Sequence, residues 1–214
     1  MSEAAQRGGQ VLPTKCRKCD RPISTPVVCD YCEALQPESL MSDYFRLLGL
    51  PRKFDLDEEE LHRKFFALNR HAHPDYHTND SPEVQALSMQ VSAAINDAYR
   101  TLKDPQRRAT YLLGLLGGRS SADDKSVPEG FLETMMMMQE ELAEAKASGG
   151  DEQQEHLSDV LKTQRDGLMR RIAGLFEEYQ QSVGCEAVRG DLLAEIRKQL
   201  NAVSYVRKLL SQLE

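Results

Sequence analysis

Apolar residues recur every three or four positions along most of the chain after residue 42, which is the spacing of amphipathic α-helices. A short helix is predicted to open at Ser42 or Asp43 and to stop at Gly49. A longer one follows Asp57, which has Glu60 three residues later in the pattern of a capping box. One apolar stripe marks its buried face: Leu61, Phe65, Leu68 and Ala72.

Pro74 interrupts this pattern, because its ring lacks a backbone donor and restrains the residue before it. Ser81 and Pro82 restart the chain as a helix cap and a first helical residue. The next helix carries a second apolar stripe: Val84, Leu87, Val91, Ile95, Ala98 and Leu102. We expect the two long helices to pair antiparallel, with the polar residues 73–80 exposed at their tip.

A further helix begins at Asp104-Pro105, and the polar, Gly- and Ser-bearing linker 118–127 follows it. Three more helices are predicted after the linker, and Ser126 with Glu129 forms a candidate capping box for the first of them. Their apolar stripes run through Phe131, Met135, Met138 and Leu142, then Leu157, Leu161, Leu168, Ile172, Leu175, Tyr179 and Val183, then Leu192, Ile196, Leu200, Val203, Val206 and Leu210. Short Gly-marked links between them favour an up-down bundle.

The first bundle helix contains four consecutive methionines. Four neighbours cannot share one helical face, so Met136 or Met137 must look outward. Methionine is flexible and polarisable, and exposed methionines suit a protein-binding surface, although a loosely packed bundle helix is the plainer alternative.

Composition agrees with a helical protein and narrows its function. The chain has 214 residues with no Trp, 29% of them are charged, and the mean hydropathy is -0.54. A net charge of -7 argues against a general nucleic-acid binder. No apolar run approaches the length of a membrane span, and residues 1–15 resemble neither a secretory signal nor a transit peptide. We expect a cytoplasmic protein; a cleaved presequence leaves the mitochondrial matrix as the alternative.

Four of the five cysteines lie within the first 32 residues, in two C-x-x-C pairs: Cys16 with Cys19, and Cys29 with Cys32. Four thiolates suit a closed, tetrahedral structural zinc site, which leaves no open position for catalysis. Iron or a cluster would also accept four thiolates, and two disulfides are a further alternative. Val27-Val28 is a candidate returning strand of a hairpin between the pairs, and we expect metal binding to fold this short module. Cys185 is expected to be buried.

The segment "HAHPDYH", residues 71–77, holds three of the five histidines. A metal site there is disfavoured, because Pro74 separates the histidines and leaves no i, i+4 pair on one helical face. A catalytic pair of His73 and Asp75 lacks a nucleophile and a Gly-rich pocket, so we expect no enzyme. A recognition tip between two helices fits the pattern best.

Several motifs resemble those of a J domain, specifically the HscB type of co-chaperone that acts in iron–sulfur cluster assembly. They are the opening "DYFRLLGLPRKFDLD", the His-Pro-Asp turn and the ending "NDAYRTLKDPQRRATYLL". The resemblance is strong over residues 42–117 and weaker toward the end of the chain. The four-Cys leader resembles that of the longer, eukaryotic-style members.

The resemblance implies that the turn engages a DnaK-type ATPase chaperone and accelerates ATP hydrolysis by that partner. The implied contacts are His73, Pro74 and Asp75, with Arg63, Lys64 and Arg70 as electrostatic candidates and a solvated helix face as the alternative for each of the three. Physically, the Asp75 carboxylate could pair with an arginine fork, and Pro74 stiffens the loop. For His71 and His77 the sequence indicates no role.

In the same family the C-terminal bundle holds an IscU-type cluster scaffold protein. The match implies a binding patch of Leu132, Met136 and Glu140 from the first bundle helix, with Phe176 from the second. The family often has an acidic residue and an arginine where Met137 and Gln139 stand, so the patch is more apolar in this chain.

The sequence therefore predicts an all-α protein in which a small metal-stabilised β-hairpin module precedes a J-domain hairpin and a three-helix bundle. The expected domains are 1–38 for the four-Cys module, 39–117 for the J domain and 128–214 for the bundle. A general J-domain co-chaperone delivering unfolded clients is the main alternative, and a zinc-dependent nucleic-acid module is a more distant one. A homodimer stays open.

Overall fold

The computed structural model describes residues 15–23 and 25–213 of the chain. Residues 1–14, on which the expectation about targeting signals falls, lie outside this range. Within the described residues there are seven α-helices and no sheet, which confirms the all-α prediction. No helix among the described residues is long and apolar enough to cross a membrane.

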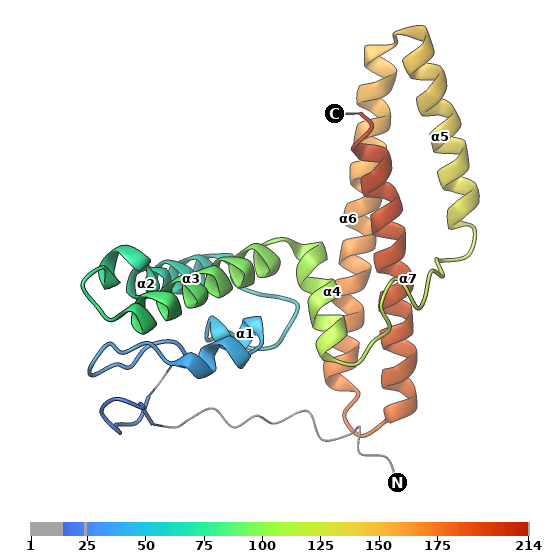
Figure 1. Cartoon of the computed structure of the whole chain (residues 1–214). Coiled ribbons are helices and arrows are strands. Elements are labelled where there is room, and N and C mark those ends of the chain that lie inside the picture. Colours follow the sequence, from blue (N-terminus) through green and yellow to red (C-terminus); the bar gives the residue numbers. More distant parts are fainter. Residues whose placement is uncertain (1–14, 24, 214) are drawn as a thin grey trace. The chain divides into compact units, whose positions relative to one another are not determined.

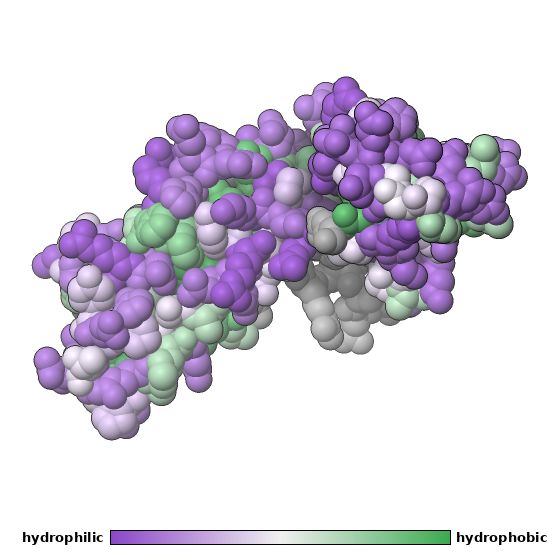
Figure 2. Space-filling view, turned by 90° about the horizontal axis from the view of Figure 1, so that it is seen from above, coloured by the Kyte–Doolittle hydropathy of each residue, from purple (hydrophilic) through white to green (hydrophobic). Residues whose placement is uncertain are grey.

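Contacts divide the chain into two compact units. The first comprises Met1–Arg52 and Leu56–Asp104, and the second comprises Lys53–Asp55 and Pro105–Glu214. Figure 1 shows the helices of each. On the face drawn in Figure 2, hydrophilic residues predominate and hydrophobic ones form separate patches among them.

The first unit is built around two long helices, α2 (Glu58–Ala72) and α3 (Pro82–Lys103), that pack side by side (Figure 1). Asp57 caps α2 by accepting hydrogen bonds from the backbone N–H groups of Glu59 and Glu60, as the sequence predicts. The packed face consists of the predicted apolar positions: Leu61, Phe65, Leu68, Ala72, Val91, Ile95, Ala98 and Leu102. This core holds the two helices as an antiparallel hairpin.

Two short helices complete the first unit, and both contact α3: η2 (Pro37–Met41) and α1 (Tyr44–Leu47). Asp43 begins α1 by accepting from the N–H groups of Phe45 and Arg46. Gly49 follows its end with a φ of +66°, a left-handed conformation that favours glycine. Phe45, Leu47 and Leu48 bring α1 into the core.

The second unit contains α4 (Pro105–Leu115), α5 (Phe131–Ser148), α6 (Asp151–Gln181) and α7 (Glu186–Leu210). Helices α6 and α7 form a long pair, and α5 packs against both (Figure 1). Helix α4, which the sequence analysis grouped with the J domain, packs against α6 and α7 in this unit. Gly149, at a φ of +67°, ends α5 and lets the chain turn into α6.

A three-residue segment from between α1 and α2, Lys53–Asp55, belongs to the second unit. The ring of Phe54 stacks on that of Phe176 from α6, with centroids 5.3 Å apart and planes 16° apart. The Arg108 guanidinium from α4 lies 5.1 Å from the centroid of the Phe54 ring. Phe54 is therefore part of the core of the second unit, although the helices of that unit begin fifty or more residues later in the sequence.

Three local predictions were wrong. The Ser126–Glu129 capping box does not form, because α5 begins only at Phe131 after Gly130, while the carbonyls of Asp124 and Ser126 accept hydrogen bonds from Asn201 of α7. Val183 is exposed because α6 ends at Gln181. Cys185 is exposed because it lies in the connection after Gly184.

The four-Cys module also differs from the predicted β-hairpin. Each C-x-x-C pair lies in a tight turn closed by one antiparallel bridge, Lys15 with Pro22 and Val28 with Leu35. Val28 thus pairs with residues after the second turn, not with those before Pro26. The described part of the module contains isolated bridges and no strand.

Candidate functional site

The His-Pro-Asp turn lies where α2 ends and before α3 begins. Pro74 starts a single turn of 3-10 helix, η3 (Pro74–His77), which His73 caps: its Nδ1 accepts a hydrogen bond from the backbone N–H of Asp75 at 3.3 Å. The proline sets the φ angle of the first position of this turn. Local sequence therefore dictates the shape of the turn.

The turn is exposed, as predicted. The side chain of Asp75 is 84% exposed and that of His73 is 44% exposed, with the His73 Nδ1 3.5 Å from an Asp75 carboxylate oxygen. Tyr76, also exposed, meets the His73 ring edge-on at 6.4 Å between centroids. We call residues 73–80 the tip. Its imidazole, carboxylate and phenol are all accessible to a partner.

Two of the three predicted cations lie free on α2. Arg63 and Arg70 are exposed, are seven residues apart on the face opposite the buried stripe, and make no ion pair within the described residues. Lys64 differs: its ammonium donates to the carbonyl of Gly49 and lies 3.1 Å from a Glu60 carboxylate oxygen. Lys64 therefore fastens α2 to the end of α1.

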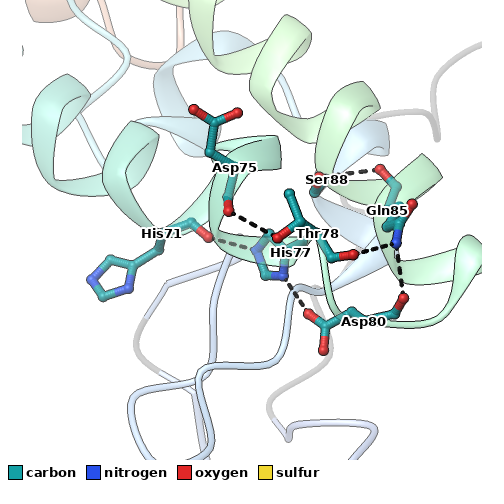
Figure 3. Close-up of polar contacts among 7 residues, drawn as sticks. All are labelled: His71, Asp75, His77, Thr78, Asp80, Gln85 and Ser88. Atoms are coloured by element: carbon teal, nitrogen blue, oxygen red, sulfur yellow. Dashed lines mark hydrogen bonds and ion pairs between the residues drawn. The ribbon is translucent and has the colours of Figure 1, made fainter.

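The tip contains a side-chain network that the sequence analysis missed (Figure 3). His77 Nδ1 lies 2.8 Å from an Asp80 carboxylate oxygen, and its Nε2 lies 2.9 Å from the backbone carbonyl of His71. The Gln85 amide of α3 donates to the carbonyls of Thr78 and Asp80 at 3.0 and 2.9 Å. His77 was assigned no role, because a single sequence does not reveal which carbonyls a ring will reach.

The four predicted metal ligands come together. The sulfurs of Cys16, Cys19, Cys29 and Cys32 all lie within 4.8 Å of one another, and two of the separations, Cys16–Cys32 and Cys19–Cys29, are 3.6 Å. Four thiolates around a zinc ion with bonds of about 2.3 Å would stand about 3.8 Å apart. All four are free thiols, and these sulfur–sulfur separations are much longer than the roughly 2 Å bond of a disulfide. The geometry fits a tetrahedral metal site.

Hydrogen bonds support the sulfurs. The backbone N–H groups of Lys18 and Tyr31 donate to Cys16 and Cys29 at 3.3 and 3.4 Å. The fully buried Gln36 donates from its amide to the Cys16 sulfur at 3.5 Å and to the Ala34 carbonyl at 2.7 Å. Donors aimed at sulfur stabilise thiolates, the form that binds metal.

The thiols also influence one another's ionisation. Burial raises the pKa of Cys16, but hydrogen bonds from the N–H groups of Cys19 and Lys18 and from the neighbouring thiols lower it to about 6. A backbone hydrogen bond at Arg21 lowers the pKa of Cys19, but burial and the neighbouring thiols raise it to about 12. Negative charges on neighbouring thiolates repel one another, which opposes ionisation of all four thiols. A bound cation would offset this repulsion.

The predicted scaffold-binding residues divide into two groups. Leu132, Met136 and Glu140 are exposed along one side of α5, and Met136 and Met137 are 64% and 63% exposed. The inward positions of this helix include Phe131, Met135 and Leu142. Phe176 is only 2% exposed because it stacks on Phe54, so its side chain is not part of the surface. We call Leu132, Met136, Met137 and Glu140 the α5 patch.

Comparison with known proteins agrees with this arrangement. The DnaJ domain family matches residues 43–111. A co-chaperone HscB homolog of Ralstonia nicotianae is 35% identical over 138 residues, covering 64% of this chain and 78% of the relative. One from Neisseria meningitidis serogroup B is 33% identical over 165 residues, covering 76% of this chain and 99% of the relative. The crystal structure of human co-chaperone HscB superposes with a TM-score of 0.76 at 25% identity, covering 93% of this chain and 96% of that one.

The hairpin and its exposed tip, with the DnaJ match across them, define a J-domain co-chaperone. The chain belongs to the HscB co-chaperone family. This membership confirms the predicted class, a co-chaperone of iron–sulfur cluster assembly that is not itself an enzyme.

Proposed function

We propose that this co-chaperone stimulates ATP hydrolysis by a DnaK-type chaperone and delivers to it an IscU-type scaffold protein. The observation that carries the first part is the exposed His73–Asp75 turn, held by η3 at the end of the packed α2–α3 hairpin. Arg63 and Arg70 on the outer face of α2 add free positive charge for an acidic partner surface. Charge of this kind increases the rate of encounter more than the affinity.

The direct test is the steady-state ATPase rate of a DnaK-type chaperone with increasing amounts of the full chain. We expect the rate to rise to a plateau, and the concentration needed for half of the increase to grow with salt, because exposed charge pairs are screened. An unchanged rate at saturating protein would refute the proposal.

The α5 patch supports the second part of the proposal. Three of its side chains are large and apolar, yet they face solvent beside the carboxylate of Glu140. Exposed apolar groups grouped beside a charge are typical of protein-binding surfaces, and methionine adapts its shape to a partner. The four thiolates of the N-terminal module are proposed to hold zinc, because the structural four-Cys sites known in proteins commonly do.

Met136→Glu tests the α5 patch. A buried charge in the contact should weaken scaffold binding by roughly 10- to 30-fold, the cost typical of a central contact residue. The measurement is calorimetric titration of an IscU-type scaffold protein into each variant. Val188→Glu is the matched control, because Val188 is an exposed apolar residue of α7 in the same unit.

Equal affinity of Met136→Glu and the wild type would exclude the patch. Capture of many unrelated unfolded clients, without preference for the scaffold, would instead favour a general J-domain co-chaperone.

A further inference from the structure

The last part of the tip, residues 78–80, belongs to no helix, yet side chains hold it on both sides. His77 connects it to the end of α2 through the His71 carbonyl, and Gln85 connects it to the start of α3 (Figure 3). Ser88 in turn donates to the Gln85 carbonyl at 3.1 Å. The Thr78 hydroxyl approaches the Asp75 carbonyl at 3.5 Å.

The bonds from His77 and Gln85 reach backbone carbonyls that lie at the end of a helix or outside one. The last carbonyls of a helix lack intrahelical donors, and Pro74 has no N–H to offer them. The imidazole of His77 supplies a donor to one such carbonyl, that of His71, and its side chain is only 12% exposed. The carbonyls of Thr78 and Asp80 lie outside any helix, and one amide nitrogen of Gln85 serves both.

The contacts enclose the His-Pro-Asp turn between two fixed points. On one side His71 and His77 are joined across the five residues between them, and on the other the chain is tied to α3 at Thr78 and Asp80. A loop that is already ordered loses less conformational entropy when a partner binds it. The two contacts at Gln85 do not touch His73, Pro74 or Asp75, so their effect on the turn is indirect.

We propose that His77 and Gln85 are positioning residues that pre-order the His-Pro-Asp turn for the chaperone. The inference rests on the proposed function, since it concerns how tightly the turn docks. It assigns a role to two polar residues beside the expected contact set. It also predicts a specific signature: affinity for the chaperone depends on the network, whereas the maximal stimulation does not.

Gln85→Glu tests this with little change of shape. Glutamate keeps the size of the side chain but has no donor, and its oxygens would face the carbonyls of Thr78 and Asp80. We expect the concentration for half-maximal ATPase stimulation to rise about tenfold, as for the loss of one or two hydrogen bonds, with the plateau retained. Amide hydrogen exchange should accelerate at residues 75–80 only.

Gln90→Glu is the matched control, because Gln90 is an exposed glutamine of the same helix and the charge change is identical. It should leave both the half-maximal concentration and the exchange unchanged. His77→Ala removes the link to α2 and should also raise the half-maximal concentration while keeping the plateau. This second variant keeps the test available if the Gln85→Glu protein folds poorly.

Equal half-maximal concentrations for the Gln85 and Gln90 variants would overturn the proposal, as would a lowered plateau in the Gln85 variant alone. Failure of the wild type to stimulate ATP hydrolysis would instead count against the proposed function. The exchange comparison does not depend on the chaperone, and unaltered exchange at residues 75–80 in both tip variants would overturn the pre-ordering itself.

Discussion

His73→Gln should lower the ATPase stimulation of the chaperone by about 30-fold or more at subsaturating concentration, the loss typical of a central interface residue. Glutamine preserves polarity and approximate size but removes the aromatic ring that faces solvent beside Asp75 and Tyr76. Because the ring is not part of the packed core of the hairpin, we expect the helical circular dichroism and the thermal midpoint to stay close to those of the wild type.

The matched control is His71→Gln. His71 is an exposed histidine two residues away whose carbonyl, not its ring, accepts the bond from His77, and Figure 3 shows the ring directed away from the network. Stimulation by this variant should stay near the wild-type value. Scaffold affinity should be the same in both variants. Full stimulation by His73→Gln in a folded state would contradict the docking role of the tip.

Removal of the metal should unfold the four-Cys module and leave the helices intact. The described part of the module buries few apolar side chains, Val27, Val28 and Leu35 among them, so it has little core of its own. Metal binding to comparable structural sites contributes about 10–16 kcal/mol in zinc-finger peptides, and that energy is folding energy. A chelator should therefore abolish amide protection at Cys29 and Gln36, whose N–H groups bond to Ala34 and Val27.

Cys16→Ser and Cys185→Ser separate ligand loss from a general thiol effect. The first should reduce metal content from about one ion per chain toward none, since three thiolates make an incomplete structural site. The second removes the exposed fifth cysteine and should leave the metal content unchanged. Metal analysis of the purified proteins identifies the ion at the same time. A Cys16 variant that keeps its metal at unchanged affinity would disprove the four-thiolate assignment.

The helices and the tip could be predicted because their signals are local. Asp57, Pro74 and Pro82 mark helix ends through the chemistry of their own backbone and side chains, and strong apolar periodicity marks the faces between them. The C-x-x-C spacing likewise brings its sulfurs together within single turns.

The failures concern contacts between distant residues. The family resemblance placed Phe176 in a binding surface, but its ring is buried and stacks on that of Phe54, more than a hundred residues away in the sequence. Lys64 looks like one more free cation of α2, but the carbonyl of Gly49 engages it. Cys185 follows an apolar pattern that continues beyond the end of its helix, because α6 ends at Gln181, four residues earlier. Periodicity alone carries no information about such partners.

Phe54 has a consequence for how the protein can be divided. A fragment that ends at Asp104 would retain the Phe54 ring but lose Phe176 and Arg108. The ring, which is buried in the whole chain, would then be exposed. The complementary fragment beginning at Pro105 would lack Phe54, so Phe176 and Arg108 would lose the ring that they contact. Proteolytic halves and shortened forms should thus tend to associate or precipitate, and a cut at the apparent border does not yield two independent molecules.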